Sequence, residues 1–298
     1  MRILVIKLGA LGDFVMAFGP FAAIRVQHPE AEITLLTTAP FAALGRAAPW
    51  FDRVLIDRRP AWWDLKGIIA LRRDLRGFDF VYDLQTSGRS SRYHRLAGSP
   101  PWSGIAAGAS HKHANPERNR MHTLERQRDQ LEMAGIRHFP APDLTWITAG
   151  GTPIPEPYAL LVPGSAPHRP EKRWAAERFG ELATLLAGRG LAPVVVGAPA
   201  DAPLAAAIAA ACPTTTDLTG KTTLLDLFGL GARAALAVGN DTGPMHIAAA
   251  VGCPCLVLFS GASDPVLTRP RGRVTVLREP DLADLAVARV AAALPDRH

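Results

Sequence analysis

The stretch Val238-Gly239-Asn240-Asp241-Thr242-Gly243-Pro244-Met245-His246 decides the fold of this chain. Its first residues end an apolar, β-branched run, its middle holds turn residues, and an apolar helical pattern follows. A strand that leads through a tight turn into a helix is the unit from which parallel α/β sheets are built. Pro244 fits the first turn of such a helix, where no backbone N–H is needed. The stretch therefore predicts a strand, a ligand-accessible turn and a helix.

The same rhythm of strand and helix recurs along the whole chain. Short apolar runs alternate with longer helical patterns, as in a parallel sheet covered by helices on both faces. The strands expected in the first half are Ile3–Lys7, Ile33–Thr37, Val54–Asp57 and Phe80–Leu84. Those expected in the second half are Ala159–Val162, Pro193–Val196, Leu236–Val238 and Cys255–Phe259, separated by helices such as Ala176–Ala187. The predicted fold class is α/β, with two Rossmann-like domains in tandem.

Around residues 148–157 the pattern gives way to glycine and proline, which is typical of an interdomain linker. We therefore expect one domain over residues 1–150 and a second over residues 151–298. Near the end of the chain, an acidic start and apolar residues at helical spacing predict a packing helix over Asp281–Leu294. The sequence leaves open whether this helix packs on the second domain or back on the first.

Length and charge agree with two domains of unequal character. At 298 residues, of which 48% are hydrophobic, the chain suffices for two cores of about 150 residues each. Its net charge of +6 comes from the first half, where residues 1–150 hold 20 Lys and Arg against 14 Asp and Glu. Residues 151–298 hold 13 of each. Either the first half meets an anionic substrate, membrane or nucleic acid, or the charge has no partner.

Two further features bound the class of protein. No run approaches the roughly 18 apolar residues of a membrane helix, and residues 1–8 have the pattern of a strand and not of a signal peptide, so we expect a cytoplasmic protein. The three cysteines, Cys212, Cys253 and Cys255, have neither the spacing nor the nearby histidines of a zinc site. They are expected to be reduced structural thiols.

The first candidate site is Gly9-Ala10-Leu11-Gly12-Asp13, a corner between a strand and an apolar helix. Ligands of open α/β sheets bind at such corners, and small residues such as Gly12 let a ligand approach the backbone. Asp13 either caps the helix or takes a proton from a hydroxyl as a general base. Lys7, at the end of the strand, either stabilises a charge state of that carboxylate or is a solvated strand end.

The second candidate site is the turn Asp241-Thr242-Gly243-Pro244. A helix N-terminus offers unpaired N–H groups and partial positive charge, which bind phosphate. Thr242 adds a hydroxyl donor, and Gly243 permits close approach of a ligand. His246 lies one turn into the helix, where a histidine is either a core residue or a ligand contact. The Asp-Thr-Gly before it favours the contact.

A matching loop follows the expected strand Ala159–Val162. It carries Gly164-Ser165 and, before the next helix, Lys172-Arg173-Trp174. Here small residues, a hydroxyl and a cation come together, and such a loop can hold the second phosphate of a diphosphate with Lys172 as the counter-charge. The alternative is an exposed loop with incidental charges.

Several other chemistries lack their motifs. The Gly9–Gly12 spacing is not that of a dinucleotide fingerprint, and Gly220-Lys221-Thr222 is not a P-loop because Thr215 replaces the first glycine. No G-x-S-x-G, H-E-x-x-H or D-x-D is present, so a hydrolase elbow, a zincin site and a metal-chelating nucleotide-sugar site are not expected. No cofactor or metal site is predicted.

Two basic segments of the first half each have two interpretations. Residues 58–66 combine two arginines, two tryptophans and a lysine ahead of an amphipathic helical pattern. This suits an anionic membrane interface, but a helix that covers the sheet with its arginines in solvent explains it equally well. The basic stretch from His111 to His122 is predicted to be a Gly/Ala-rich loop that either meets an anionic acceptor or is disordered and solvated.

Together these motifs resemble glycosyltransferase family 9, the ADP-heptose:lipopolysaccharide heptosyltransferases, across nearly the whole chain. The resemblance rests on Met1–Lys7 with Gly12-Asp13, on Pro163-Gly164-Ser165 with Lys172-Arg173-Trp174, on Gly197-Ala198-Pro199, and on Asp241–His246. It implies a GT-B fold, in which two Rossmann-like domains face each other across a cleft. It also implies that the donor binds the C-terminal domain and the acceptor mostly the N-terminal one, with inverting, metal-independent transfer.

The resemblance implies residue roles by position. Asp13 resembles the catalytic base of the family, with Lys7 beside it. The positions similar to donor contacts are Ser165, Lys172, Asp241, Thr242, Gly243 and His246. Those similar to nucleoside contacts are Asp201 and Thr222, and Gly12 completes the predicted substrate-binding residues.

The function that the resemblance implies is transfer of a heptose, or a related sugar, from ADP-heptose to the phosphorylated inner core of lipopolysaccharide. The acceptor would lie at the cytoplasmic face of the inner membrane, with peripheral membrane contact left open and no nucleic-acid partner. Two alternatives stay open at this point. One is a sugar-nucleotide epimerase or hydrolase on the same scaffold, and the other is an inactive sugar-nucleotide-binding protein.

Overall fold

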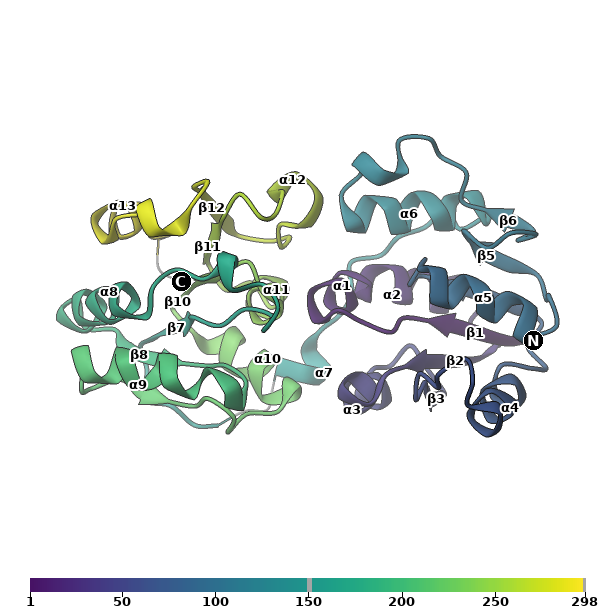
Figure 1. Ribbon diagram of the computed structural model, residues 1–298, viewed down its shortest axis with the longest axis horizontal. Helices are drawn as coiled ribbons and strands as arrows, with labels where there is room; N and C mark the ends of the chain where they lie inside the picture. Colours follow the sequence, from purple (N-terminus) through teal and green to yellow (C-terminus); the bar gives the residue numbers. More distant parts are fainter. Residues whose placement is uncertain (149–151, 297–298) are drawn as a thin grey trace. The chain divides into compact units, whose positions relative to one another are not determined.

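The computed structural model describes residues 1–148 and 152–296 and divides the chain into two compact units, Met1–Asp143 and Leu144–His298. Each unit is built on a six-stranded sheet whose strand pairs are all parallel (Figure 1). The predicted α/β class with two parallel sheets is confirmed. The predicted boundary between residues 150 and 151 lies outside the described residues, and the division between the units comes earlier, after Asp143.

The first unit alternates strands with helices. Its elements are β1 Arg2–Ile6, α1 Leu11–Met16, α2 Phe18–Gln27, β2 Glu32–Thr37, α3 Ala39–Ala47, β3 Arg53–Ile56, α4 Leu65–Asp74, β4 Phe80–Asp83, α5 Gly88–Leu96, β5 Trp102–Gly104, β6 His111–Lys112, the 3-10 turn η1 Arg118–Arg120, and α6 Thr123–Met133.

The second unit repeats the alternation. Its elements are α7 Thr145–Thr148, β7 Tyr158–Val162, η2 Pro170–Lys172, α8 Ala176–Gly188, β8 Ala192–Val195, η3 Pro199–Asp201, α9 Ala202–Ala211, β9 Thr216–Asp217, α10 Leu224–Arg233, β10 Leu236–Asn240, α11 Gly243–Ala250, β11 Cys255–Phe259, α12 Pro265–Thr268, β12 Val274–Arg278, η4 Leu282–Asp284, and α13 Val287–Ala292.

The two sheets have the same strand order, β3-β2-β1-β4-β5-β6 in the first and β9-β8-β7-β10-β11-β12 in the second. This is the Rossmann order, in which the direction of progression reverses between the first and the fourth strand. β1 therefore pairs with β4, and β7 pairs with β10. At such a switch point the loops diverge at the carboxyl ends of the strands and leave a crevice for a ligand.

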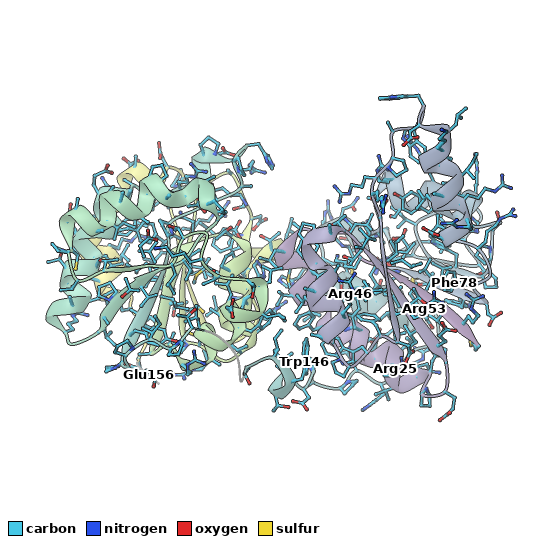
Figure 2. The ribbon with its side chains drawn as sticks, turned by 90° about the horizontal axis from the view of Figure 1, so that it is seen from below. Arg25, Arg46, Arg53, Phe78, Trp146 and Glu156 are labelled. Atoms are coloured by element: carbon cyan, nitrogen blue, oxygen red, sulfur yellow. The ribbon has the colours of Figure 1, made fainter. Side chains whose placement is uncertain are left out.

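Both faces of the first sheet are covered, which is why β1 is a continuous apolar run without alternation. On one face, Leu71 of α4 and Tyr93 of α5 pack with Leu4 and with Phe78, which is labelled in Figure 2. The other face carries an aromatic cluster of α1, α2 and the segment after α3, formed by Phe14, Phe18, Phe21, Trp50 and Phe51. Arg25, also labelled in Figure 2, ties α2 to this segment through the Trp50 carbonyl (3.2 Å).

The predicted single helix over Asp281–Leu294 is wrong. The structure has the short turn η4 and then α13, with Leu285 in an extended conformation between them. The Leu285 carbonyl accepts hydrogen bonds from the Trp174 indole (2.8 Å) and the Arg178 guanidinium (2.7 Å), and these replace the helical bond. The apolar pattern is nevertheless satisfied, because Leu285 and Val290 are buried in the core that α8 forms in the second unit.

Four strands extend the sheets beyond those predicted: β5, β6, β9 and β12. The stretch from His111 to His122, predicted to be a loop, is mostly irregular, but it begins with the two residues of β6 and contains the 3-10 turn η1. Elsewhere, Cys212, Cys253 and Cys255 are free and buried. Within residues 1–148 and 152–296, no helix is long and apolar enough to cross a membrane.

Candidate active site

The turn after β1 places Asp13 at the switch point of the first sheet. Gly9 has a φ of 131°, a conformation that side chains rarely adopt, and the ring of Phe41 lies 2.9 Å from where a Cβ would stand. α1 then starts at Leu11, so Gly12 and Asp13 both fall in its first turn. A carboxylate in that position is favoured by the helix dipole.

Asp13 does not cap α1. The N-cap residue is Ala10, and it makes no side-chain cap bond. Among the residues that the structure describes, none forms a hydrogen bond or ion pair with the half-buried Asp13 carboxylate. The interpretation as a helix cap therefore has no bond to support it.

Lys7 directly follows β1 and is only 3% exposed, so its interpretation as a solvated strand end is wrong. Its ammonium donates to the Leu84 carbonyl (3.2 Å). Burial lowers the pKa of Lys7, and the Arg126 guanidinium lowers it further, while the Asp13 and Asp83 carboxylates raise it. Burial is the largest of these effects, so the net direction is a lowered pKa, and the two carboxylates only partly oppose it.

Asp83 is the residue of this site that the sequence interpretation missed. It ends β4 opposite Ile6 and is 0% exposed. One carboxylate oxygen accepts the backbone N–H groups of Gln85 (3.1 Å) and Thr86 (3.0 Å). Burial raises the pKa of Asp83 to about 6, although these hydrogen bonds and Lys7 act in the opposite direction. The available signal was an acid as the last residue of an apolar strand, at the same sheet edge as Lys7.

This pKa makes stability depend on pH. The Asp83 carboxyl has a pKa of about 6 when folded and about 3.9 when unfolded, so the folded state binds more protons between these values. Stability contributed by this group is therefore lost as the pH rises through that window. Relative to the Asp83→Asn variant, we expect the wild type to lose up to about 3 kcal/mol of unfolding free energy between about pH 4 and pH 7. Urea unfolding at each pH measures the difference, and parallel profiles would contradict the assignment.

The basic stretch after β6 is ordered, and not a disordered loop. His113 is buried, and its Nε2 lies 2.7 Å from the Asp129 carboxylate. Arg118 Nε donates to His113 Nδ1 (3.1 Å), which requires that nitrogen to be unprotonated. Burial and the nearby Arg118 and Arg126 charges lower the pKa of His113, against the opposing effect of Asp129. The neutral histidine therefore holds the Arg118 guanidinium in place.

In the second unit, Asn240 joins the loops of the other switch point. It ends β10 and is fully buried. Its side-chain oxygen accepts the Trp174 N–H (3.0 Å), and its amide nitrogen donates to the Pro163 carbonyl (2.7 Å). These bonds fix the loop after β7, the segment before α8 and the turn before α11 against one another.

Two residues that were predicted separately, Lys172 and Asp241, are brought together there. Lys172 Nζ lies 2.6 Å from the Asp241 carboxylate, and the two side chains are only 17% and 6% exposed. Lys172 is therefore not an incidental charge on an exposed loop. Thr242 is the N-cap residue of α11 without a side-chain cap bond, so its hydroxyl is not used to close the helix start. His246 follows one turn in and is mostly buried.

The remaining predicted residues of this unit line the neighbouring loops. The Ser165 hydroxyl donates to the Arg169 carbonyl (2.9 Å) and accepts from Arg173 (3.0 Å), so it shapes its own loop. Asp201 is buried and caps η3 through the Ala198 N–H (2.9 Å). It also lies against the backbone of Gly164, because a Cβ added there would be 2.5 Å from its carboxylate.

Thr222 is half-buried in the loop after β9. That loop is linked to the segment after β8 by the hydrogen bond from Gly220 N to the Gly197 carbonyl (2.9 Å), and Gly220 lies against Pro199 of η3. Across residues 1–148 and 152–296, no group of three or more His, Cys, Asp or Glu side chains could hold a metal ion. The predicted donor-side residues therefore gather on four loops at one edge of the second sheet.

Comparison with known proteins agrees with this geometry. The structure of Escherichia coli heptosyltransferase WaaC with ADP covers 98% of this chain and 98% of its own, with 23% identity and a TM-score of 0.80. The fold class predicted from the motifs, GT-B, is thereby confirmed. Among curated sequences, the lipopolysaccharide core heptosyltransferase OpsX of Haemophilus influenzae is 24% identical over 89% of this chain and 80% of its own length.

The matches extend to the family. Lipooligosaccharide heptosyltransferase 2 of Haemophilus influenzae is 36% identical over 128 residues, which are 41% of this chain and only 36% of that protein. The family model described as glycosyltransferase family 9 (heptosyltransferase) matches residues 68–283. The chain belongs to this family, as its motifs predicted. The matched range contains the whole donor-side cluster but not Lys7 and Asp13.

Proposed function

We propose that this protein is an inverting, metal-independent heptosyltransferase that uses ADP-heptose and an acceptor of the lipopolysaccharide core. The observation that carries the proposal is the chemistry at the two switch points. One presents the Asp13 carboxylate, which has no hydrogen-bond partner among the described residues, in the electrostatic neighbourhood of the buried Lys7 amine. The other presents a helix start beside the pair of Lys172 and Asp241. The first suits a base and the second suits a diphosphate.

The donor would be held by its diphosphate at the start of α11. The Thr242 hydroxyl, which makes no cap bond, and the backbone of Gly243 would face the ligand there, and the helix dipole favours negative charge. A phosphate would be repelled by the Asp241 carboxylate unless that charge were neutralised. Lys172, at 2.6 Å, neutralises it and leaves further ammonium protons for the phosphate. Asp201 and Thr222, on the adjoining loops, would contact the nucleoside. Ser165 and His246 would contact the rest of the donor.

The reaction would be a single displacement. Asp13 accepts the proton of an acceptor hydroxyl, and that oxygen forms a bond to the anomeric carbon. The bond from this carbon to the diphosphate oxygen breaks, and the electron pair leaves with the nucleotide. Attack from the opposite face inverts the anomeric centre. The charge that develops on the leaving diphosphate is stabilised by the α11 N-terminus and Lys172.

A donor panel tests the proposal. Thermal unfolding is measured with ADP-, GDP-, UDP- and dTDP-linked sugars, and the products with and without a lipopolysaccharide core acceptor are identified by mass spectrometry. We expect stabilisation by ADP-heptose, about 2.7 kcal/mol at a hundredfold excess over Kd, and a product that requires acceptor. Turnover of donor alone would instead indicate an epimerase or hydrolase. Binding without any turnover would indicate an inactive binding protein, and no shift with ADP-linked sugars would rule out the donor.

A further inference from the structure

The segment that leads into α4 exposes three large apolar side chains close together in sequence. Trp63 is 84% exposed, Leu65 is 72% exposed and Ile69 is 67% exposed. We call these three residues, together with the cations of residues 58–76, the α4 surface. Single exposed apolar residues are ordinary, but three within one turn and its preceding loop form a patch that calls for a partner.

α4 is apolar on two faces, which separates the two interpretations of its sequence. Leu71 and Leu75 pack into the core of the first unit, so one face covers the sheet. Leu65 and Ile69 are spaced four residues apart and face away from that core. The same helical stripe continues into Arg72, which is exposed. The packing of α4 on the sheet therefore explains why Leu71 and Leu75 are apolar. It does not explain why the exposed residues Leu65 and Ile69 are apolar.

The apolar patch is surrounded by positive charge. Residues 58–76 contain six Lys and Arg and two Asp. Both acids are engaged locally, since Asp64 accepts the Gly67 N–H (2.9 Å) as the N-cap of α4 and Asp74 lies 3.4 Å from Arg73. On the adjacent loop, Trp62 lies under the guanidinium groups of Arg89 (5.2 Å) and Arg92 (5.1 Å). The α5 arginines therefore extend the cationic rim.

The α4 surface also adjoins the proposed base. Its segment leaves the carboxyl end of β3, at the same sheet edge as the turn after β1. The Arg59 guanidinium donates to the Leu8 carbonyl (3.4 Å), which connects the two loops directly. The α4 surface and the turn that carries Asp13 therefore lie at the same edge of the first sheet.

We propose that the α4 surface docks on an anionic phospholipid bilayer. An exposed tryptophan with aliphatic neighbours suits the interfacial zone of a bilayer, and surrounding Lys and Arg attract anionic headgroups. A protein partner fits less well, because the cores of protein interfaces are depleted in charge, whereas Lys66 lies between the apolar residues of this patch. The inference does not depend on the proposed function, because docking needs neither donor nor acceptor.

Vesicle co-sedimentation of the full chain tests this proposal. The vesicles are phosphatidylcholine alone, or phosphatidylcholine with about 30% phosphatidylglycerol, at low and high salt. We expect binding to the anionic vesicles only, weakened by salt. Trp63→Ser/Leu65→Ser/Ile69→Ser should lower the partition coefficient at least about tenfold. Lys66→Gln/Arg72→Gln should lower it about fivefold for each removed cation.

Matched controls lie in the same unit. Val26→Ser removes an apolar side chain that is 52% exposed on α2, and Arg46→Gln removes an exposed cation of α3 (Figure 2). Both variants should bind like the wild type. The charge variant keeps the test valid if the apolar variant fails to fold. The proposal would be overturned if the wild type did not bind the anionic vesicles, or if the folded apolar variant bound them as well as the wild type. It would also be overturned if the wild type formed a dimer that the apolar substitutions dissociate and did not bind vesicles.

Discussion

Replacing Asp13 by alanine is expected to lower kcat about 10²- to 10⁴-fold, the range for loss of a general base, and to leave donor affinity unchanged. The rate should fall because no other group is proposed to take the proton of the acceptor hydroxyl. Donor affinity should not change, because the Asp13 carboxylate makes no hydrogen bond among the described residues and its removal breaks none. Steady-state rates at saturating donor and acceptor measure the effect, and donor affinity is measured separately by thermal unfolding.

The controls for Asp13 separate chemistry from folding. Glu30→Gln removes an exposed acid of the same unit and should keep the full rate. Asp13→Asn keeps the shape of the side chain and removes only its basicity, so it should lose as much activity as Asp13→Ala. A folded Asp13→Ala protein with the wild-type rate would exclude Asp13 as the base, while the donor site in the second unit would be unaffected by that result.

Replacing Lys172 by methionine is expected to raise the donor KM roughly 10- to 100-fold, because a charge-assisted bond to phosphate is lost. The variant should also lose about 3 kcal/mol of unfolding free energy, since it leaves the mostly buried Asp241 carboxylate without its partner. Initial-rate kinetics and urea unfolding measure the two effects. Lys112→Met, at an exposed lysine of β6, is the matched control and should change neither.

A second substitution, at Asp241, distinguishes a ligand-binding role of Lys172 from a structural one. Asp241→Asn in the Lys172→Met background removes the uncompensated charge and should restore most of the stability. Donor affinity should stay weak, because the cation is still missing. Recovery of both properties together would show that Lys172 acts only through Asp241.

The strands that the sequence predicts well are those of the two sheet centres. β7, β11 and the part of β1 after Arg2 are buried on both faces, so each is an unbroken apolar run that the hydrophobic pattern detects directly. β6 and β9 have two residues each and lie at sheet edges, and both contain a charged residue. Their pairing depends on a neighbouring strand brought from elsewhere in the chain, which no local pattern encodes.

The candidate site shows the same division. Asp241-Thr242-Gly243 and Asp13 could be found from the sequence because each stands in a local turn between a strand and a helix. Asp83 could not be identified as a site residue from a local turn. Its role depends on its burial near Lys7, and that burial depends on the pairing of β1 with β4. The interruption of the predicted C-terminal helix also depends on distant residues. The Leu285 carbonyl accepts hydrogen bonds from Trp174 and Arg178, which are more than a hundred residues away in the sequence.

The position of Asn240 has a consequence for how freely the sequence can vary. Its carboxamide both accepts from the Trp174 backbone and donates to the Pro163 backbone, and neither partner is a side chain that could change in compensation. Aspartate of the same size cannot donate, leucine can do neither, and glutamine is one methylene too long for a fully buried site. A saturation library at this codon should therefore retain asparagine almost alone, although asparagine itself need never touch a substrate.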